Sequence, residues 1–403
     1  MSRYYSYLNT SAEIIKQYDG NVPLAVYLKS FFAANKKYGS KDRKQISHLC
    51  YCFFRTGKMF AFNNPAKDDV LLKQYITAAL FLCSQEPNDL LLQLEPQWNE
   101  LAHLALADKF SILKNHTSFF FLSSLSSVFP WKEELSETID HALFCKHFFI
   151  QPDLFIRVRP GYKESVEHTL MNAQIPYHFI NNACIGLPNH TKVQEILKVD
   201  KEIVIQDYSS QRVAEFMEPV QRDKRLVVWD CCAASGGKSI LAIDVLKNIE
   251  LTVSDIRSSI IANLNKRFNA AGIIHYKSIV ADLTNNSHPL FKQSFNLVVC
   301  DAPCSGSGTW GRTPEQLFYF RAEQITEYHL LQKKIVYNVL PAVKPGGYLL
   351  YITCSVFKKE NEAIVDEILI SGNMQVVQSG IIKGYDKKSD TMFAALLQKQ
   401  LQQ

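Results

Sequence analysis

The feature that most constrains the fold is the alternation of short β-rich runs with helical segments from residue 226 onward. The expected strands are LVVW, LTVSD, IVAD, FNLVVCD and YLLYITC, and the helix before the last of these carries one apolar stripe, Ile325, Tyr328, Leu331, Ile335 and Val339. Such alternation predicts an α/β domain with a mostly parallel sheet and helices on both faces. One further apolar run, in the tail SDTMFAALLQKQ, is expected to add an edge strand.

Residues 1–145 show the spacing of helices instead. Apolar residues recur every three or four positions in PLAVYLKSFFAANKKYG and RKQISHLCYCFFRTGK, and SAEIIKQYDG predicts a helix that Ser11 caps. Basic side chains gather here with only Asp42 among them, and they form either a solvated face or a surface that contacts phosphates: Lys36, Lys37, Lys41, Arg43, Lys44, Arg55 and Lys58.

Residues 146–222 form a third region with short elements of their own. FIRVRP, YHFI and EIVIQD are expected strands, and YKESVEHTLMNAQ is an expected helix between the first two. The polar segment QRDKR near residue 222 joins this region to the α/β domain. A chain of 403 residues is long enough for two or three domains, and we expect the divisions 1–145, 146–222 and 223–403.

A loop of small residues follows the first strand of the α/β domain, in the sequence LVVWDCCAASGGKS. Its end, Gly236-Gly237-Lys238-Ser239, resembles a loop that binds nucleotide phosphates. The phosphate loop of ATPases and GTPases needs another glycine five positions before Gly237, where this chain has Cys232. The dinucleotide fingerprint is absent too, so a nucleotide-triphosphate site is the weaker interpretation of this loop.

Four expected strands end in an aspartate or within a residue of one: Asp230, Asp255, Asp282 and Asp301. In doubly wound sheets the ligand lies beyond the carboxyl ends of the strands, so these acids should surround it. Carboxylates repel phosphates but suit a cationic ligand with ribose hydroxyls and an amine, and S-adenosylmethionine has all three features. Small residues in the loop would let the backbone approach it closely: Ala233, Ala234, Ser235, Gly236 and Gly237.

Two cysteines follow strands on the same side of the expected sheet. Cys304 and Cys354 each open a polar turn, whereas Cys300 within its strand is expected to be a buried apolar residue. Carbon 5 of a pyrimidine is a poor nucleophile, but a thiolate that adds at carbon 6 turns it into an enamine-like carbanion able to attack a methyl sulfonium. The two thiols therefore predict covalent catalysis of pyrimidine methylation.

Together these motifs resemble the cytosine-5 RNA methyltransferase family: DCCAASGGKS, VSD, AD, DAPCSGSGTWGRTPE, VKPGGYLLYITCS and ENE at 360–362, with VIQDYSSQRVAEFM upstream. The resemblance implies a class I Rossmann-like methyltransferase sheet in 223–403 and a cofactor loop from Cys232 to Lys238. It also implies that Asp255 binds the ribose, that Asp282 lies beside the adenine and that Asp301 lies between cofactor and target base, where it can hydrogen-bond the cytosine.

The resemblance also assigns roles to the two thiols. In this family the Thr-Cys-Ser cysteine, here Cys354, is the nucleophile, and the Pro-Cys-Ser cysteine, here Cys304, helps to release the product. Spacing alone does not separate them, because cytosine-5 DNA methyltransferases use the Pro-Cys thiol. Where the family usually has Pro in the cofactor loop, this chain has Ser235, and Arg159 stands where Asn is common.

The front of the chain resembles RNA-binding parts of the same family. Residues 1–145 resemble the helical domain similar to transcription antitermination factor B, and residues 146–222 resemble a small RNA-recognition-like extension. We therefore expect RNA as the partner, ribosomal RNA before transfer RNA, for an S-adenosylmethionine-dependent enzyme active in rRNA processing. An RNA-binding ribosome assembly factor without catalysis is the alternative from another class.

Composition limits the remaining possibilities. No C-x-x-C pair occurs among the ten cysteines, which argues against a zinc site or a disulfide scaffold and for a reduced, cytoplasmic setting. We expect no bound metal. No apolar run is long enough to span a bilayer, so no membrane partner is expected. The net charge of +5 permits a polyanionic partner without requiring one, and a monomer is the default expectation.

Overall fold

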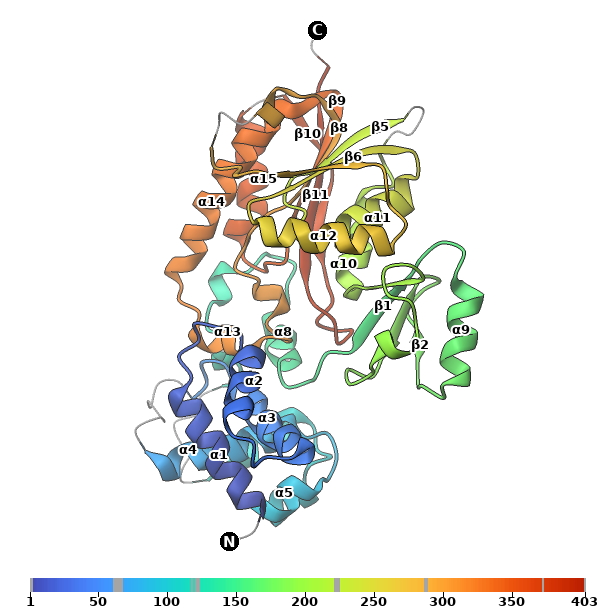
Figure 1. The fold of residues 1–403 in the computed structure, drawn as a ribbon. Helices are drawn as coiled ribbons and strands as arrows, with labels where there is room; N and C mark the ends of the chain where they lie inside the picture. The colour runs from blue at the N-terminus through green and yellow to red at the C-terminus, as the bar shows by residue number, and fades with distance from the viewer. Residues whose placement is uncertain are drawn as a thin grey trace. The chain divides into compact units, whose positions relative to one another are not determined.

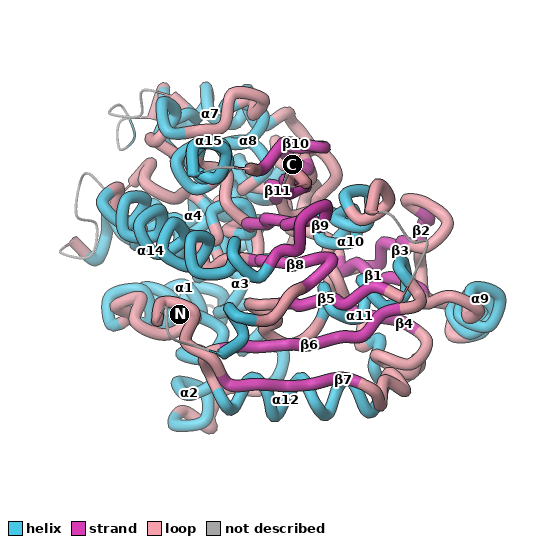
Figure 2. Tube along the Cα trace, turned by 90° about the horizontal axis from the view of Figure 1, so that it is seen from above, coloured by secondary structure: helices cyan, strands magenta, loops and turns pink. Residues whose placement is uncertain are grey.

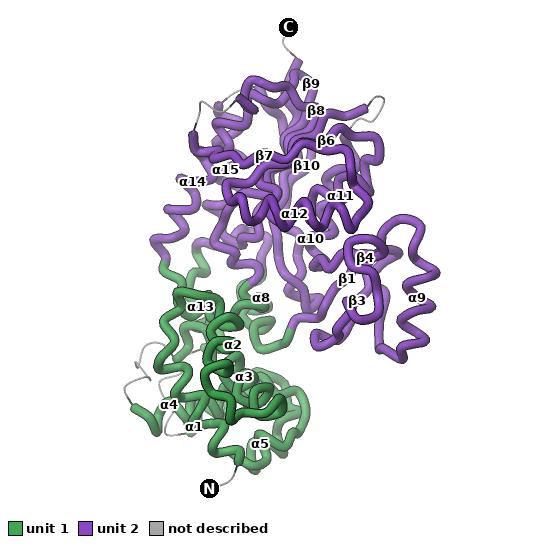
Figure 3. The backbone as a smooth tube through the Cα atoms, in the orientation of Figure 1, with its two compact units in different colours: residues 1–133, 140–151, 310–321 green, residues 134–139, 152–309, 322–403 purple. Residues whose placement is uncertain are grey.

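The computed structural model describes residues 3–60, 68–116, 119, 124–220, 225–285, 289–371 and 373–401. The chain divides into two compact units (Figure 3). The first comprises 1–133, 140–151 and 310–321, and the second comprises 134–139, 152–309 and 322–403. The division expected after residue 222 lies in 221–224, outside the described residues, so the three-domain arrangement stays a prediction.

The first unit is helical (Figure 1). Its α-helices among the described residues are α1 (Arg3–Gln17), α2 (Leu24–Ala34), α3 (Ser40–Arg55), α4 (Asp69–Cys83), α5 (Asp89–Leu94), α6 (Pro96–Glu100), α7 (Leu106–Lys114), α8 (His141–His147) and α13 (Pro314–Tyr319). Helices α2 and α3 confirm the periodicity seen in the sequence. The prediction that Ser11 caps a helix is wrong, because Ser11 lies inside α1. Its buried hydroxyl donates to the carbonyl oxygens of Tyr7 and Ile46, at 2.8 and 3.2 Å, because a buried donor needs a partner.

The basic cluster of this unit is smaller than the sequence indicates. Arg55 is only 3% exposed, and its guanidinium donates to the carbonyl oxygen of Phe148 at 2.8 Å and to Gln151 at 2.8 Å. Lys58 donates to the carbonyl oxygen of Phe318. Both cations therefore hold the unit together. The exposed members are Lys36, Lys37, Lys41, Arg43 and Lys44, and their contact with phosphates stays a prediction.

The second unit begins with a small antiparallel sheet in the order β2-β3-β1-β4. Its strands are β1 (Leu154–Val158), β2 (His178–Phe179), β3 (Cys184–Leu187) and β4 (Ile203–Ile205), and α9 (Lys163–Asn172) and α10 (Tyr208–Arg212) accompany them. The four residues of β3 were not predicted. Their pattern is too short to show a period, and it is the pairing with β1 and β2 that makes them a strand.

A larger sheet of seven strands follows, in the order β10-β11-β9-β8-β5-β6-β7 (Figure 2). The strands are β5 (Leu226–Asp230), β6 (Ile249–Asp255), β7 (Tyr276–Val280), β8 (Phe295–Asp301), β9 (Val343–Thr353), β10 (Met374–Ile382) and β11 (Met392–Lys399). From β7 to β9 every pairing is parallel. The order reverses between β5 and β8, as in a doubly wound fold, and this confirms the predicted class.

Helices pack on both faces of this sheet and enclose two apolar cores. Alternate residues of β8 point into different cores: Leu297 and Val299 lie with residues of α11 (Gly237–Leu246) and α12 (Ser258–Ala270). Val298 and Cys300 lie with residues of α14 (Glu323–Val339) and α15 (Glu362–Ser371). A strand buried on both sides must be apolar throughout, which is why FNLVVCD shows no alternation.

The last strand differs from its prediction. Strand β11 does not lie at an edge of the sheet but pairs with both β9 and β10, antiparallel to each. The edge is β10, which has mostly half-exposed or exposed residues and was not predicted as a strand. The stretch MFAALL is apolar throughout because β11 is interior. No helix among the described residues has the length and apolar character to cross a bilayer.

Candidate active site

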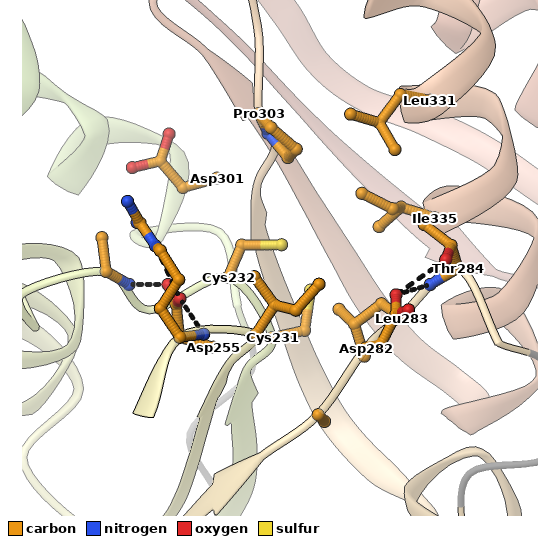
Figure 4. Close-up of a pocket in the computed structure, with 14 residues that line it drawn as sticks. Cys231, Cys232, Asp255, Asp282, Leu283, Thr284, Asp301, Pro303, Leu331 and Ile335 are labelled. Atoms are coloured by element: carbon orange, nitrogen blue, oxygen red, sulfur yellow. Dashed lines mark hydrogen bonds and ion pairs between the residues drawn. The ribbon is translucent and has the colours of Figure 1, made fainter. Parts of the chain in front are cut away.

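A cavity of about 410 Å³ lies where β5, β6 and β8 end (Figure 4). Parallel neighbours bring their carboxyl ends to one edge, so the loops after these strands meet there. The lining residues are Cys231, Cys232, Ala234, Asp255, Ile256, Arg257, Ala281, Asp282, Leu283, Thr284, Asp301, Pro303, Leu331 and Ile335. The wall is thus mainly apolar, with acidic groups at separate points, as is common for a small-molecule site.

Three of the four predicted aspartates line this cavity. Asp255 accepts hydrogen bonds from the backbone N–H groups of Ala234 at 3.1 Å and Arg257 at 3.0 Å. It therefore fixes the cavity loop and the turn after β6 together. Asp282 accepts from the N–H and the hydroxyl of Thr284, at 2.9 and 2.7 Å, and these bonds lower the pKa of its carboxyl.

The fourth aspartate, Asp230, is not among the lining residues. It is 1% exposed and accepts a hydrogen bond from the hydroxyl of Ser239 at 2.5 Å. Burial raises the pKa of Asp230 to about 7. Asp230 thus ties the end of β5 to the first turn of α11, and the predicted ring of four acids reduces to three at the cavity.

The loop from Cys232 to Lys238 contributes to the cavity with only part of its length. Cys232 and Ala234 line it, whereas Ala233 packs into the core and Ser235 receives two hydrogen bonds from Arg267. Lys238 forms an ion pair with Asp301 at 3.2 Å and donates to Ser210 at 2.8 Å.

The glycines of this loop set its path. Gly236 has a φ of +84°, and a Cβ there would lie 2.6 Å from the ring of Phe268. Gly237 follows as the first residue of α11. The position of Gly236 therefore demands a residue without a side chain, both for its left-handed backbone and for its closeness to α12.

The two predicted catalytic thiols lie against each other. The Sγ atoms of Cys304 and Cys354 are 3.2 Å apart, and both residues are partly exposed free cysteines. One follows β8 and the other β9, and these strands pair in parallel with Asp301 opposite Ile352. Asp301 and Pro303 also line the cavity, so the segment before Cys304 runs along the cavity wall.

Close backbone packing holds this pair in place. Gly308 donates its N–H to the carbonyl oxygen of Cys354 at 2.9 Å, and its own carbonyl oxygen accepts from the N–H of Thr391, also at 2.9 Å. A Cβ on Gly308 would come 1.9 Å from the carbonyl oxygen of Thr391. Only glycine fits between these two segments, and the start of β11 thereby supports the thiol loops.

The contact between the sulfurs raises the pKa of Cys304. The hydrogen bond to Cys354 is the main cause and burial the second. A negative charge on Cys304 would be disfavoured both by burial and by the loss of its hydrogen bond to Cys354. Cys304 therefore stays a protonated thiol that can donate its hydrogen to the sulfur of Cys354.

Glu360 connects the two thiol loops, a role that the motif ENE did not reveal. Its fully buried carboxylate accepts from the N–H of Ser305 at 2.8 Å, from the hydroxyl of Ser355 at 3.0 Å and from the amide of Gln332 at 3.2 Å. Burial raises the pKa of Glu360. The sequence singled out Glu360 only as part of the motif ENE, which gave it no role.

Trp310, which follows the Cys304 turn in sequence, belongs to the core of the first unit. It is 1% exposed, and its ring lies 6.1 Å from that of Trp131 and 4.7 Å from that of Phe320. A tryptophan just after the Cys304 turn could wall a target base or pack in a core, and the structure shows the second.

Comparisons with known proteins find similarity over the C-terminal part of the chain. Residues 214–397 match the family described as 16S rRNA methyltransferase RsmB/F. Ribosomal RNA small subunit methyltransferase B of Xylella fastidiosa strain 9a5c is 32% identical over 170 residues, which cover 42% of this chain and 39% of that protein. The match thus spans about two fifths of the relative's length.

Two solved structures share the fold. The crystal structure of PH0851 covers 99% of this chain and 100% of its own, with a TM-score of 0.72 and 19% identity. NSun6 from Pyrococcus horikoshii, solved with SFG, covers 72% of this chain and 97% of its own, with a TM-score of 0.54 and 15% identity. At these identities the likeness shows the fold alone.

Proposed function

We propose that the chain is an RNA methyltransferase of the RsmB/F kind, whose family model matches residues 214–397, and that it uses S-adenosylmethionine to methylate carbon 5 of a cytosine. The observation that carries the proposal is the pair of thiols, Cys304 and Cys354, 3.2 Å apart beside an acid-lined cavity. Two cysteines from separate strand ends have no structural need to meet at a partly exposed position. Covalent pyrimidine chemistry, in contrast, needs two thiols at such a position.

The residues of the cavity fit the proposed cofactor. Asp255 and Asp282 offer carboxylate oxygens to ribose hydroxyls and to an adenine amine, and Asp301 lies on the side of the thiols. The apolar side chains of Leu283, Leu331 and Ile335 suit the faces of an adenine ring. SFG, found with NSun6, is an analogue of the same cofactor. The cofactor supplies an electrophilic methyl group.

The thiols divide the reaction into easier steps. The Cys354 thiolate bonds to carbon 6 of the cytosine, and carbon 5 becomes nucleophilic enough to take the methyl group. The proton on carbon 5 then leaves to a base, and the bond between sulfur and carbon 6 breaks. Cys304 acts in this release. Its raised pKa supports the assignment, because a group that stays protonated is a hydrogen-bond donor to the nucleophile rather than the nucleophile itself.

The RNA substrate must present its cytosine outside a helix, since the thiolate attacks the face of the ring. We propose ribosomal RNA as the target, with transfer RNA as the second candidate. Bisulfite sequencing of both RNAs from a strain without the protein tests this directly. A lost methylcytosine in ribosomal RNA supports the first, and one lost only from transfer RNA contradicts it.

Substitution of each thiol tests the mechanism. Cys354→Ala should abolish turnover, because no adduct can form. Cys304→Ala should leave RNA bound covalently to the protein, seen as a slow band in a denaturing gel. Cys184→Ala, which removes a buried thiol of the small sheet, is the control and should retain turnover. The reverse pattern, with RNA trapped only by the Cys354 variant, would exchange the two roles.

The same assay separates the enzyme from a non-catalytic assembly factor. The protein is incubated with labelled S-adenosylmethionine and total RNA from cells that lack it. Incorporation of label supports the enzyme. Measurable cofactor binding with no incorporation into any RNA would favour the assembly factor.

A further inference from the structure

Three cysteines outside the catalytic pair bring their sulfur atoms together beside the cavity. The Sγ atoms of Cys231, Cys232 and Cys300 all lie within 4.8 Å of one another. Cys231 and Cys232 follow β5, and Cys300 is in β8, the parallel neighbour of β5. The N–H of Cys231 donates to the carbonyl oxygen of Val299 at 2.9 Å, so the register of the two strands places Cys300 beside the pair.

The cluster is buried on one side and reaches the cavity on the other. Cys231 and Cys300 are 1% and 0% exposed, and they lie in the core under α14 and α15. Cys232 is half-buried, and both Cys231 and Cys232 line the cavity, where Figure 4 shows the sulfur of Cys232. Each cysteine alone suits an apolar core. Packing does not require that three sulfurs converge.

Convergent thiols are what soft cations select. In a tetrahedral zinc site the metal–sulfur bonds are about 2.3 Å, which puts the sulfurs about 3.8 Å apart. A spread within 4.8 Å reaches that geometry by small side-chain rotations. The carboxylate of Asp301 acts electrostatically on both Cys232 and Cys300, and a nearby negative charge favours a bound cation.

We propose that Cys231, Cys232 and Cys300 form a site for one soft, thiophilic cation such as Zn²⁺ or Cu⁺, with a coordination position open to the cavity. Binding replaces the proton of each thiol by a metal–sulfur bond and releases the protons to solvent. The sequence led us to expect no metal because it contains no C-x-x-C pair. Here the third ligand comes from another strand, so spacing along the chain does not reveal it.

The position of the site has a consequence for the cavity. Because Cys231 and Cys232 are part of its wall, the cation and a ligand of the cavity occupy adjoining space. Binding of one should weaken binding of the other, and by linkage the effect is reciprocal. This consequence rests on the proposed function, which supplies the cavity's ligand. The cation site itself does not.

A cadmium titration tests the site. The full-length protein carries Cys304→Ser and Cys354→Ser, so that the catalytic pair cannot bind the ion. We expect a thiolate-to-cadmium charge-transfer absorption that saturates at one ion per chain. Adding Cys300→Val, which replaces the buried thiol by an apolar side chain without a ligand atom, should remove this absorption. Adding Cys184→Val instead, at another buried thiol, should leave it unchanged.

A second variant is needed in case Cys300→Val fails to fold. Cys232→Ala changes a half-buried side chain at the cavity and should also remove the absorption. No absorption in the starting protein, or an absorption that survives both Cys300→Val and Cys232→Ala, would overturn the proposal.

S-adenosylhomocysteine tests the shared cavity in the same preparation. At a hundred times its dissociation constant it should raise the cadmium concentration for half-saturation about 100-fold if the two exclude each other. Binding of this compound is measured by calorimetry. If it binds and the cadmium titration does not change, the two ligands do not exclude each other, and that part of the proposal is wrong. Failure of the compound to bind would count against the proposed function, while the titration without it still decides the cation site.

Discussion

At the scale of single residues, Glu360 shows how the two thiol loops keep their relation. One carboxylate accepts hydrogen bonds from Ser305 and Ser355, the residues directly after Cys304 and Cys354. Glu360 is not among the residues that line the cavity. It is therefore a positioning residue, which acts on the thiols through the turns that carry them.

Glu360→Gln tests whether Glu360 acts on the thiols without acting on the cavity. An amide nitrogen would replace one acceptor, so one of the buried donors around it would lose its partner at a cost of about 1–3 kcal/mol. We expect a lower kcat with an unchanged dissociation constant for S-adenosylhomocysteine, measured by methyl transfer and calorimetry. Glu367→Gln, on α15 in an ion pair with Lys333, is the matched control and should be near neutral. A full kcat in the Glu360 variant would contradict the positioning role.

Asp230 makes the stability of the fold depend on pH. Its pKa is raised from 3.8 to about 7, so between these values the unfolded chain releases a proton that the folded chain retains. The contribution of Asp230 to stability is therefore complete below about pH 4 and declines as the pH rises toward 7.

Asp230→Asn should remove this dependence. The Asn carbonyl oxygen still accepts from Ser239, and it carries no charge to bury. Urea unfolding at pH 5 and pH 8 should show that the variant gains stability relative to the unaltered protein as the pH rises. Equal differences at both pH values would show that Asp230 does not titrate in this range.

At the scale of elements, buried ion pairs attach the small sheet to the helices of the large one. Arg157 and Arg159, in and just after β1, contact Asp244 of α11 at 2.6 and 2.9 Å. Arg267 of α12 contacts Asp200 before β4 at 2.6 Å. Arg159 also donates to the carbonyl oxygens of Asp200 and Ala271. Arg159, which stands where the family commonly has Asn, thus makes structural contacts in this chain.

Arg159→Ala tests that attachment. The change leaves Asp244 with one buried partner and two carbonyl oxygens without a donor, and we expect a loss of about 3 kcal/mol in unfolding free energy. Lys192→Ala removes an exposed pair with Glu195 in the same region and should cost less than about 1 kcal/mol. Similar urea midpoints for both variants would contradict the role of Arg159.

At the scale of the whole molecule, the chain does not divide into units in sequence order. Residues 310–321 follow the Cys304 turn, yet they belong to the helical unit. There Glu315 accepts from the N–H of Leu24 at 3.1 Å, and the hydroxyl of Tyr319 donates to the carbonyl oxygen of Tyr18 at 2.5 Å. Leu317 is fully buried.

A fragment that starts at residue 146 should therefore fold poorly, although it contains both sheets. It would expose Leu317, Trp310 and Phe320, which are buried in the full chain. Exposed apolar patches of this kind promote aggregation. We expect a soluble yield far below that of the full chain, measured by size-exclusion chromatography. A second fragment with residues 310–321 replaced by a Gly/Ser linker should recover solubility, and an equally soluble first fragment would contradict the prediction.

The sequence by itself determined the alternation of strands and helices, the loop at Gly236 and the positions of acids and thiols at strand ends. These features depend on neighbours along the chain, through periodicity, backbone freedom and the common edge of parallel strands. The tertiary structure decided the rest: that Cys304 meets Cys354, that Cys300 joins Cys231 and Cys232, that Asp230 turns inward and that β11 is interior. Most of these depend on contacts between segments far apart in sequence. Packing and strand register set such contacts, and no local pattern encodes them.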